Sequence, residues 1–290
     1  MELNELMKEI DVKVQRLIDN FSFLLTYREL FRGTGLEFAQ LKEYVPGEDD
    51  ASRIDWKASL RTDDIFVKQY EEERDLNIIV LLDTSSSMLF GTKRQLKSEF
   101  AGLIAGAIIR AGIKIGDNVG FGIFSNGIDK FFEPSNEDTM YYKSLNMIVD
   151  DNTYGNKCDL KNSLRYILNN IDEDSYLFII SDFIGLNEGW ENSLKMVSGK
   201  LNGVIGIMVR DERDEKLPKG SGKFRLQDPY SGNTIVIDLD KAKDKFEKLA
   251  KEQSENVKTE FRRSDCGFIK VFTDEPFIKN LIQEMRLKKF

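Results

Sequence analysis

Five short apolar segments, separated by longer stretches of helical character, constrain the fold more than any other feature of this sequence. They begin after residue 75 and read LNIIVLL, VGFGIF, YLFIIS, VIGIMV and FIKVF. Strands that alternate with helices are typical of a parallel sheet with helices on both faces. We therefore predict an α/β domain with a doubly wound, mostly parallel sheet over residues 75–290.

The stretches between these strands have the apolar spacing of helices. We expect helices at residues 93–113, 138–150, 160–171, 188–200, 241–262 and 276–289. The first contains the small residues Ala101, Gly102, Ala105 and Gly106, which would let it lie close to the sheet. Residues 211–238 are rich in turn residues with alternating apolar positions, and we interpret them as an inserted hairpin.

The first 74 residues follow a different pattern. Apolar residues recur every three or four positions in residues 1–20, which predicts an amphipathic helix. Between Phe31 and Arg74, glycines and prolines separate short apolar pieces, and IFVKQY alternates like an exposed strand. We therefore predict an N-terminal helix and β-hairpin segment at residues 1–74, followed by the main domain at residues 75–290.

Composition excludes several classes of function. The chain has no histidine, so Ser-His-Asp and Cys-His catalysis and histidine-based zinc sites are excluded. Sites with oxygen ligands for Mg²⁺ or Ca²⁺ remain open. A net charge of −8 argues against nucleic-acid binding, which needs clustered Lys and Arg.

Cysteine usage and the apolar runs indicate the compartment. Cys158 and Cys266 are far apart and have no paired spacing, so neither a disulfide framework nor a thiolate zinc site is indicated. The start of the chain lacks the features of a signal peptide, and its longest apolar run is too short to span a bilayer. We expect a soluble, cytoplasmic protein with no membrane span.

Polar residues follow two of the predicted strands. Asp83, Ser85 and Ser87 lie in LLDTSSSM after the first strand, and Asp182 lies in IISDF after a later one. In open parallel sheets, ligands bind at the carboxyl ends of the strands, so these side chains are expected to converge. Hard oxygen ligands of low total charge suit Mg²⁺ or Mn²⁺ and leave a position for a partner's carboxylate.

Other interpretations of DTSSS remain open. Thr84 or a serine could cap the following helix. A phosphohydrolase with Asp83 as nucleophile, as in haloacid-dehalogenase-type enzymes, is an alternative, although those enzymes have a second Asp at the position of Ser85. A structural scaffold with a vestigial site is a further alternative. A nucleophile elbow is excluded because no serine has the flanking glycines, and no P-loop is present.

The motifs resemble a known family. DTSSSM followed by SDF resembles the von Willebrand factor type A domain and its metal-ion-dependent adhesion site, whose signature is D-x-S-x-S. The preceding GTGLEFAQLKEYVPGEDDASRIDWKASLRTDDIFVKQYEEERD and the later LPKGSGKFRLQDPYSGN resemble a bacterial and archaeal family known as domain of unknown function number fifty-eight. The resemblance extends from about Arg32 to the end of the chain.

This resemblance implies a function and a ligand set. It implies a von Willebrand factor A-like domain that is not an enzyme and that uses a divalent ion for protein contact. The implied partner is a MoxR-type AAA+ ATPase, with a chaperone-like role in the assembly or maturation of other proteins. The residues that the resemblance implies as ligands are Asp83, Ser85, Ser87 and Asp182.

One ligand position departs from the family pattern. The family has a threonine in a T-D-L motif, and this chain has Cys158 there, in CDL. A thiol is a poor ligand for magnesium. We expect a weakened site, a substitute ligand such as Thr153 from the same loop, or a loss of metal dependence.

RIDWKAS is a second candidate surface. Arg53, Trp56 and Lys57 could form a docking surface for the ATPase, since exposed Trp and Arg often anchor interfaces. The alternative, which we prefer, is that Trp56 packs the hairpin onto the main domain while the charged side chains remain solvated.

Overall fold

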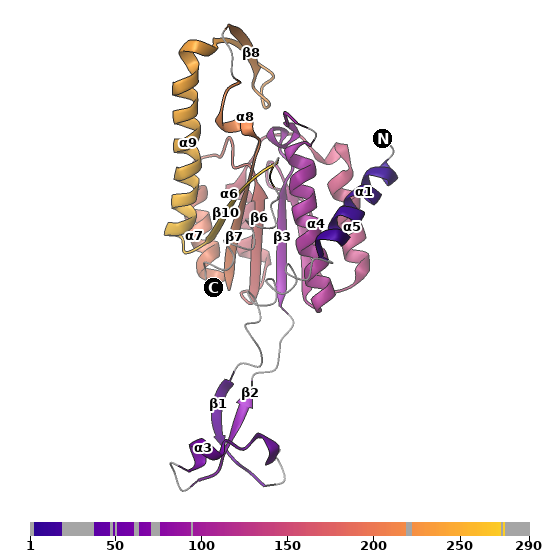
Figure 1. The fold of residues 1–290 in the computed structure, drawn as a ribbon, viewed down its shortest axis with the longest axis vertical. Helices are drawn as coiled ribbons and strands as arrows, with labels where there is room; N and C mark the ends of the chain where they lie inside the picture. The colour runs from indigo at the N-terminus through magenta and orange to yellow at the C-terminus, as the bar shows by residue number, and fades with distance from the viewer. Residues whose placement is uncertain are drawn as a thin grey trace.

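The core of the protein is a six-stranded sheet with the strand order β10-β7-β6-β3-β4-β5 (Figure 1). The computed structural model describes residues 3–18, 38–46, 49, 51–60, 64–70, 76–93, 95–218, 222–273 and 275. The parallel strands are β3 (Asn77–Asp83), β4 (Asn118–Phe124), β6 (Ser175–Ser181), β7 (Gly203–Arg210) and β10 (Gly267–Phe272). The prediction of a mostly parallel α/β sheet is confirmed.

Strand β5 (Ile128–Ser135), which was not predicted, pairs with β4 in the antiparallel direction. This strand lies at the edge of the sheet and is half-buried along its length. It contains Pro134, a residue that strands tolerate mainly at an edge. A half-exposed strand with a proline lacks the continuous apolar run that marks the buried parallel strands.

Helices lie on both faces of the sheet (Figure 1). Successive residues of a strand point to opposite faces. Ile78, Val80 and Leu82 of β3 accordingly join an apolar cluster with α1 (Leu3–Ile18), α4 (Lys97–Ile115) and α5 (Asp138–Val149). Ile79 and Leu81 join a second cluster with α6 (Leu160–Asn170), α7 (Trp190–Lys200) and α9 (Leu239–Arg263). The helix predicted at residues 276–289 lies outside the described residues.

The two glycines of α4 face other helices, which corrects the expectation that they approach the sheet. A Cβ added at Gly102 would lie 2.3 Å from Cγ2 of Ile148 in α5. One added at Gly106 would lie 3.2 Å from Cγ2 of Val14 in α1. The hydroxyl of Tyr141 in α5 also donates to Asp11 Oδ1 in α1 at 2.9 Å. These three helices therefore pack as one layer, with the glycines at their contacts.

Two hairpins extend from this core. Strands β1 (Phe38–Glu43) and β2 (Phe66–Tyr70) pair in the antiparallel direction, with η1 (Ala51–Arg53) and α3 (Trp56–Ser59) between them. After β7 come α8 (Glu212–Glu215) and the antiparallel pair β8 (Lys223–Gln227) and β9 (Thr234–Asp238). Figure 1 shows the two hairpins at opposite ends of the central sheet. The boundary between segments 1–74 and 75–290 stays a prediction, and α1 packs against α4 and α5 of the main domain.

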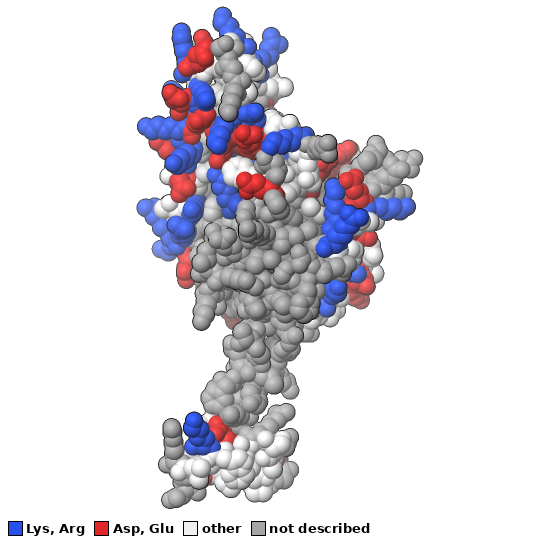
Figure 2. Space-filling model, in the orientation of Figure 1, with Lys and Arg blue, Asp and Glu red and all other residues white. Residues whose placement is uncertain are grey.

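The surface agrees with the composition. In Figure 2, basic and acidic side chains are interspersed over the region of α9 and β8–β9. On this face the described residues form no separate basic patch of the kind that nucleic-acid binding requires. No helix within the described ranges is both long and apolar enough to cross a membrane.

Candidate metal centre

The candidate residues lie at the switch point of the sheet. Strands β3 and β6 are neighbours, and the chain leaves β3 for β4 on one side before it returns to β6 on the other. Ligands bind at such points, outside the carboxyl ends of the strands. Asp83 is the last residue of β3, and Ser181 is the last residue of β6. The Ser181 hydroxyl donates to Asp83 Oδ2 at 2.6 Å, which joins the two strand ends.

The Asp83 carboxylate is fully buried. Its Oδ1 accepts the backbone N–H of Ser85 at 2.8 Å, and its Oδ2 accepts the Ser181 hydroxyl. Burial, and then the negative charge of Asp182, raises the pKa of Asp83 to about 6, although the hydrogen bonds oppose this shift. The Ser85 hydroxyl and the Cys158 thiol also contact this carboxylate, so its hydrogen-bond donors among the described residues are all neutral. The charge of Asp83 is therefore poorly compensated by the protein, and a cation would compensate it.

Two serine hydroxyls lie beside this carboxylate. Ser85 Oγ and Ser87 Oγ are 3.2 Å apart, and both residues are buried. Ser85 precedes η2 (Ser86–Leu89), but its side chain makes no capping hydrogen bond, and the Thr84 hydroxyl donates to Phe124 O of β4. The capping interpretation is therefore wrong for Thr84 and Ser85. The hydroxyls of Ser85 and Ser87 instead add neutral oxygens to the site.

Tyr230, in the turn between β8 and β9, covers the serines. Its hydroxyl lies 3.0 Å from Ser87 Oγ and 2.9 Å from the carbonyl oxygen of Ile184. Tyr230 was not predicted as a site residue, because a tyrosine in the turn DPYSGN belongs to no motif. The inserted hairpin therefore closes over the carboxyl end of the sheet.

Asp182 lies in a different environment from Asp83. Its Oδ1 accepts the N–H of Ile184 at 2.9 Å, and its Oδ2 accepts Lys97 Nζ at 2.7 Å. Lys97 is 1% exposed and also lies 3.0 Å from Asp214 Oδ2 of α8. Neither Lys97 nor Asp214 stands in a motif, so this ion pair could not be predicted from the sequence.

The loop before α6 brings Cys158 to the site but not Thr153. Burial, and then the charges of Asp83 and Asp182, raise the pKa of the Cys158 thiol well above its usual range, so it remains protonated. The Thr153 hydroxyl donates to the carbonyl oxygen of Asp150 at 2.7 Å, at the end of α5. This geometry does not favour Thr153 as a substitute ligand.

Comparison with known proteins assigns the chain to a family. The sequence profile of the family described as "Protein of unknown function DUF58" matches residues 40–256. The chain belongs to this family. An uncharacterized protein of Mycobacterium tuberculosis is 27% identical over 259 residues, which cover 88% of this chain and 80% of that protein. Uncharacterized protein YeaD of Bacillus subtilis is 29% identical over 107 residues, which cover 37% of this chain and 24% of that protein.

Solved structures similar to this DUF58 protein are more distant. BatB from Bacteroides thetaiotaomicron has a TM-score of 0.49 and 17% identity, over 73% of this chain and all of that one (100%). An aerotolerance-related membrane protein from Bacteroides fragilis has a TM-score of 0.47 and 18% identity, over 73% of this chain and 100% of that one. Likenesses this distant say nothing of function.

A strained residue holds the loop that carries Asp182. Phe183 has a φ of 53°, a conformation that costs a bulky residue on the order of 1–3 kcal/mol. Its ring is buried against Phe261 of α9, with the ring centroids 5.3 Å apart. Its carbonyl oxygen accepts Nε2 of Gln253, also in α9, at 2.6 Å. Packing against α9 therefore maintains the backbone next to Asp182.

The surface around RIDWKAS corrects one interpretation. Trp56 is 64% exposed and Lys57 is exposed, so the expectation that Trp56 packs the hairpin onto the main domain is wrong. The Asp55 carboxylate accepts the N–H groups of Lys57 and Ala58 and thereby caps α3, a helix with no buried residues. The side chain of Arg53 lies outside the described part of the chain. Docking of a partner on this surface stays a prediction.

Proposed function

We propose that this DUF58 protein is a non-enzymatic protein-interaction module built on a doubly wound, von Willebrand factor A-like domain. Its buried oxygen cluster would bind Mg²⁺ or Mn²⁺ as a metal-ion-dependent adhesion site. The observation that carries the proposal is Asp83, a fully buried carboxylate at the switch point whose pKa is raised to about 6 beside two serine hydroxyls. An oxygen-only donor set of this kind suits a small hard cation.

Each residue of the cluster has a role in this proposal. Asp83, Ser85 and Ser87 would hold the ion, and the ion would supply a positive centre that attracts a carboxylate of the partner. One carboxylate and two neutral hydroxyls leave half of the divalent ion's charge unneutralised, which favours such a further ligand. Tyr230 Oη lies against Ser87, so the partner's carboxylate would displace this phenol. The β8–β9 turn is thus the part of the surface that the partner meets first.

The partner that the family resemblance suggests is a MoxR-type AAA+ ATPase. The module would act with it in the assembly or maturation of other proteins, in a chaperone-like role in the cytoplasm. The exposed Trp56 and Lys57, at the other end of the sheet in Figure 1, offer a second contact surface for this partner.

A Mn²⁺ titration of the metal-stripped protein tests the metal part of this proposal. We expect saturable binding at one site, measured by electron paramagnetic resonance, and displacement of the bound Mn²⁺ by Mg²⁺. Absence of binding in the millimolar range would contradict a partner-independent metal site. Turnover of a generic phosphate ester that is lost in Asp83→Asn would favour the phosphohydrolase alternative instead.

Cys158→Ser is expected to strengthen Mg²⁺ binding. The change replaces a protonated thiol beside Asp83 with a hydroxyl, and a hard cation prefers oxygen to sulfur. We expect an increase in affinity of about tenfold, the lower end of the effect of a residue adjacent to the ligands. Cys266→Ser is the matched control, because Cys266 is also a buried cysteine but its thiol lies against Ser264 O. Equal effects of the two changes would show that Cys158 does not influence the ion.

A further inference from the structure

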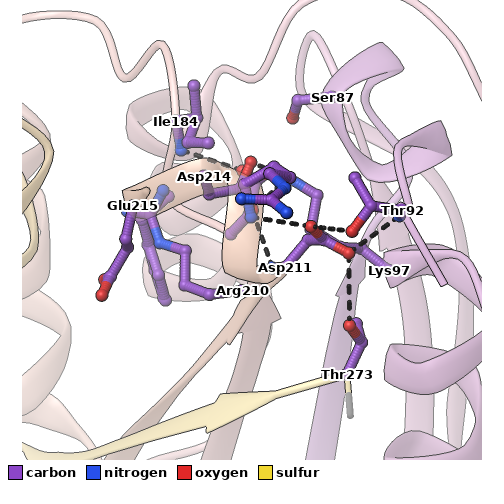
Figure 3. A network of polar contacts seen from close by, with 12 residues as sticks. Ser87, Thr92, Lys97, Ile184, Arg210, Asp211, Asp214, Glu215 and Thr273 are labelled. Atoms are coloured by element: carbon purple, nitrogen blue, oxygen red, sulfur yellow. Dashed lines mark hydrogen bonds and ion pairs between the residues drawn. The ribbon is translucent and has the colours of Figure 1, made fainter. Parts of the chain in front are cut away.

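Lys97 occupies an unfavourable position for a lysine. It is the first residue of α4, where the helix dipole opposes a positive charge, and it is 1% exposed. A fully buried lysine is rare unless it is paired. The ammonium lies 2.7 Å from Asp182 Oδ2, 3.0 Å from Asp214 Oδ2 and 5.6 Å from the centre of the Phe90 ring. It therefore joins the start of α4, the loop after β6 and α8 (Figure 3).

Buried ion pairs of this kind are a poor source of stability. Replacement of such a group by well-packed apolar side chains is often neutral or stabilising, because burial of the charges costs more than their attraction returns. A role beyond stability would explain a lysine at a position where both burial and the helix dipole oppose it. The position of Lys97 next to the candidate metal centre suggests which role.

The contacts of the two central carboxylates differ in one decisive respect. Among the described residues, Asp83 has only neutral hydrogen-bond donors: the N–H and hydroxyl of Ser85, the Ser181 hydroxyl and the Cys158 thiol. Asp182 accepts the positively charged ammonium of Lys97 on Oδ2 and the N–H of Ile184 on Oδ1. The Asp182 charge is therefore compensated in part by Lys97, which Asp182 shares with Asp214, and its oxygens are directed by two fixed donors.

We propose that Lys97 is a positioning residue that withholds Asp182 from the divalent ion. The ion then has Asp83 as its one carboxylate ligand among the described residues and retains enough charge to capture a carboxylate of the partner. This inference rests on the proposed function, because it concerns the same ion. The inference changes the expected ligand set, because Asp182 is then not a ligand and is held away from the ion by Lys97.

The test compares variants that keep the buried charge balanced. Lys97→Met/Asp214→Asn removes one cation and one anion together, and Asp214→Asn alone is its reference. We expect the double variant to bind Mn²⁺ about 10- to 100-fold more tightly than the reference, a typical range for residues that orient metal ligands. Addition of Asp182→Asn should cancel this gain. Water-proton relaxation should show fewer waters on Mn²⁺ in the double variant, because Asp182 takes one position.

Two further variants keep the test decisive. Asp182→Asn in the wild-type background should weaken Mn²⁺ binding much less than Asp83→Asn does. These two single variants can be compared even if the double variant does not fold. An equally large loss for both would overturn the inference. Lys143→Met, at an exposed lysine of α5, is the control for a change of surface charge and should leave Mn²⁺ binding unaltered.

The outcomes separate this inference from the proposed function. If the wild type binds Mn²⁺ and the double variant binds no more tightly than Asp214→Asn, the role of Lys97 is refuted and the metal site stands. If only the double variant binds, Lys97 withholds Asp182 as proposed, and the wild-type site needs its partner to hold the ion. If neither binds, both the metal site and the role of Lys97 are refuted.

Discussion

Asp83→Asn is expected to abolish Mn²⁺ and Mg²⁺ binding and also to stabilise the metal-free protein at pH 7. The amide removes the charge that would bind the ion. It also removes a carboxylate whose ionised form is disfavoured by full burial and by the nearby charge of Asp182. A residue that lowers stability while it serves binding is expected at a functional site. Loss of binding together with a gain in stability would therefore identify Asp83 as the central ligand.

The pH dependence of stability follows from the direction of this pKa shift. The pKa of Asp83 rises from 3.8 to about 6 on folding, so the folded protein binds more protons than the unfolded chain between these values. The free energy of unfolding should therefore fall as the pH rises through this window, by about 3 kcal/mol for this group. Urea unfolding of the metal-free protein at pH 4, 5, 6 and 7 measures this loss, which Asp83→Asn should remove.

Asp172→Asn provides the matched control for Asp83→Asn. Asp172 is an exposed aspartate that precedes β6, at the end of the sheet opposite to Asp83. This change should alter neither Mn²⁺ binding nor the slope of stability with pH between 4 and 6. Retention of tight Mn²⁺ binding in Asp83→Asn would remove the basis of the proposed metal site.

Phe261→Ala is expected to lower the free energy of unfolding by about 3–5 kcal/mol, the usual cost of removing a buried aromatic ring. Phe261 of α9 is fully buried. Its ring centroid lies 5.3 Å from those of Phe183 and Phe268 and 6.0 Å from that of Trp190. It also fills the space over Gly206 of β7, where an added Cβ would lie 2.4 Å from the ring. Removal of this ring is therefore expected to leave a cavity.

The same change should weaken the candidate metal centre from a distance. Phe183 depends on the Phe261 ring for its packing, and Asp182 precedes it in the chain. Urea unfolding measures the loss of stability, and Mn²⁺ titration of the variant under folding conditions measures the effect on the site. Leu249→Ala is the control on the same helix, because Leu249 is 54% exposed. A similar loss of stability in both variants would show that α9 is held by something other than the Phe261 cluster.

The parts of the fold that the sequence predicts are those with a local signal. The parallel strands are continuous apolar runs, and the placement of Asp83, Ser85 and Ser87 follows from their position directly after one of them. Lys97, Asp214 and Tyr230 reach the site from distant parts of the chain, and no spacing rule connects a residue of α4 with α8 or with the β8–β9 turn. The small size of Gly102 and Gly106 predicts a close packing contact, but helix periodicity alone does not identify the neighbouring element.

The backbone conformation and the side-chain packing at position 183 favour different amino acids. Its backbone conformation is one that glycine adopts without strain, whereas the buried space beside Phe261 and Phe268 is filled by an aromatic ring. Glycine would relax the backbone and empty the core, and a smaller apolar residue would keep the strain and lose the packing. None of the twenty amino acids meets both demands. Few substitutions are therefore expected to be tolerated at position 183. This limit applies next to Asp182, although the ring of Phe183 itself lies in the apolar core.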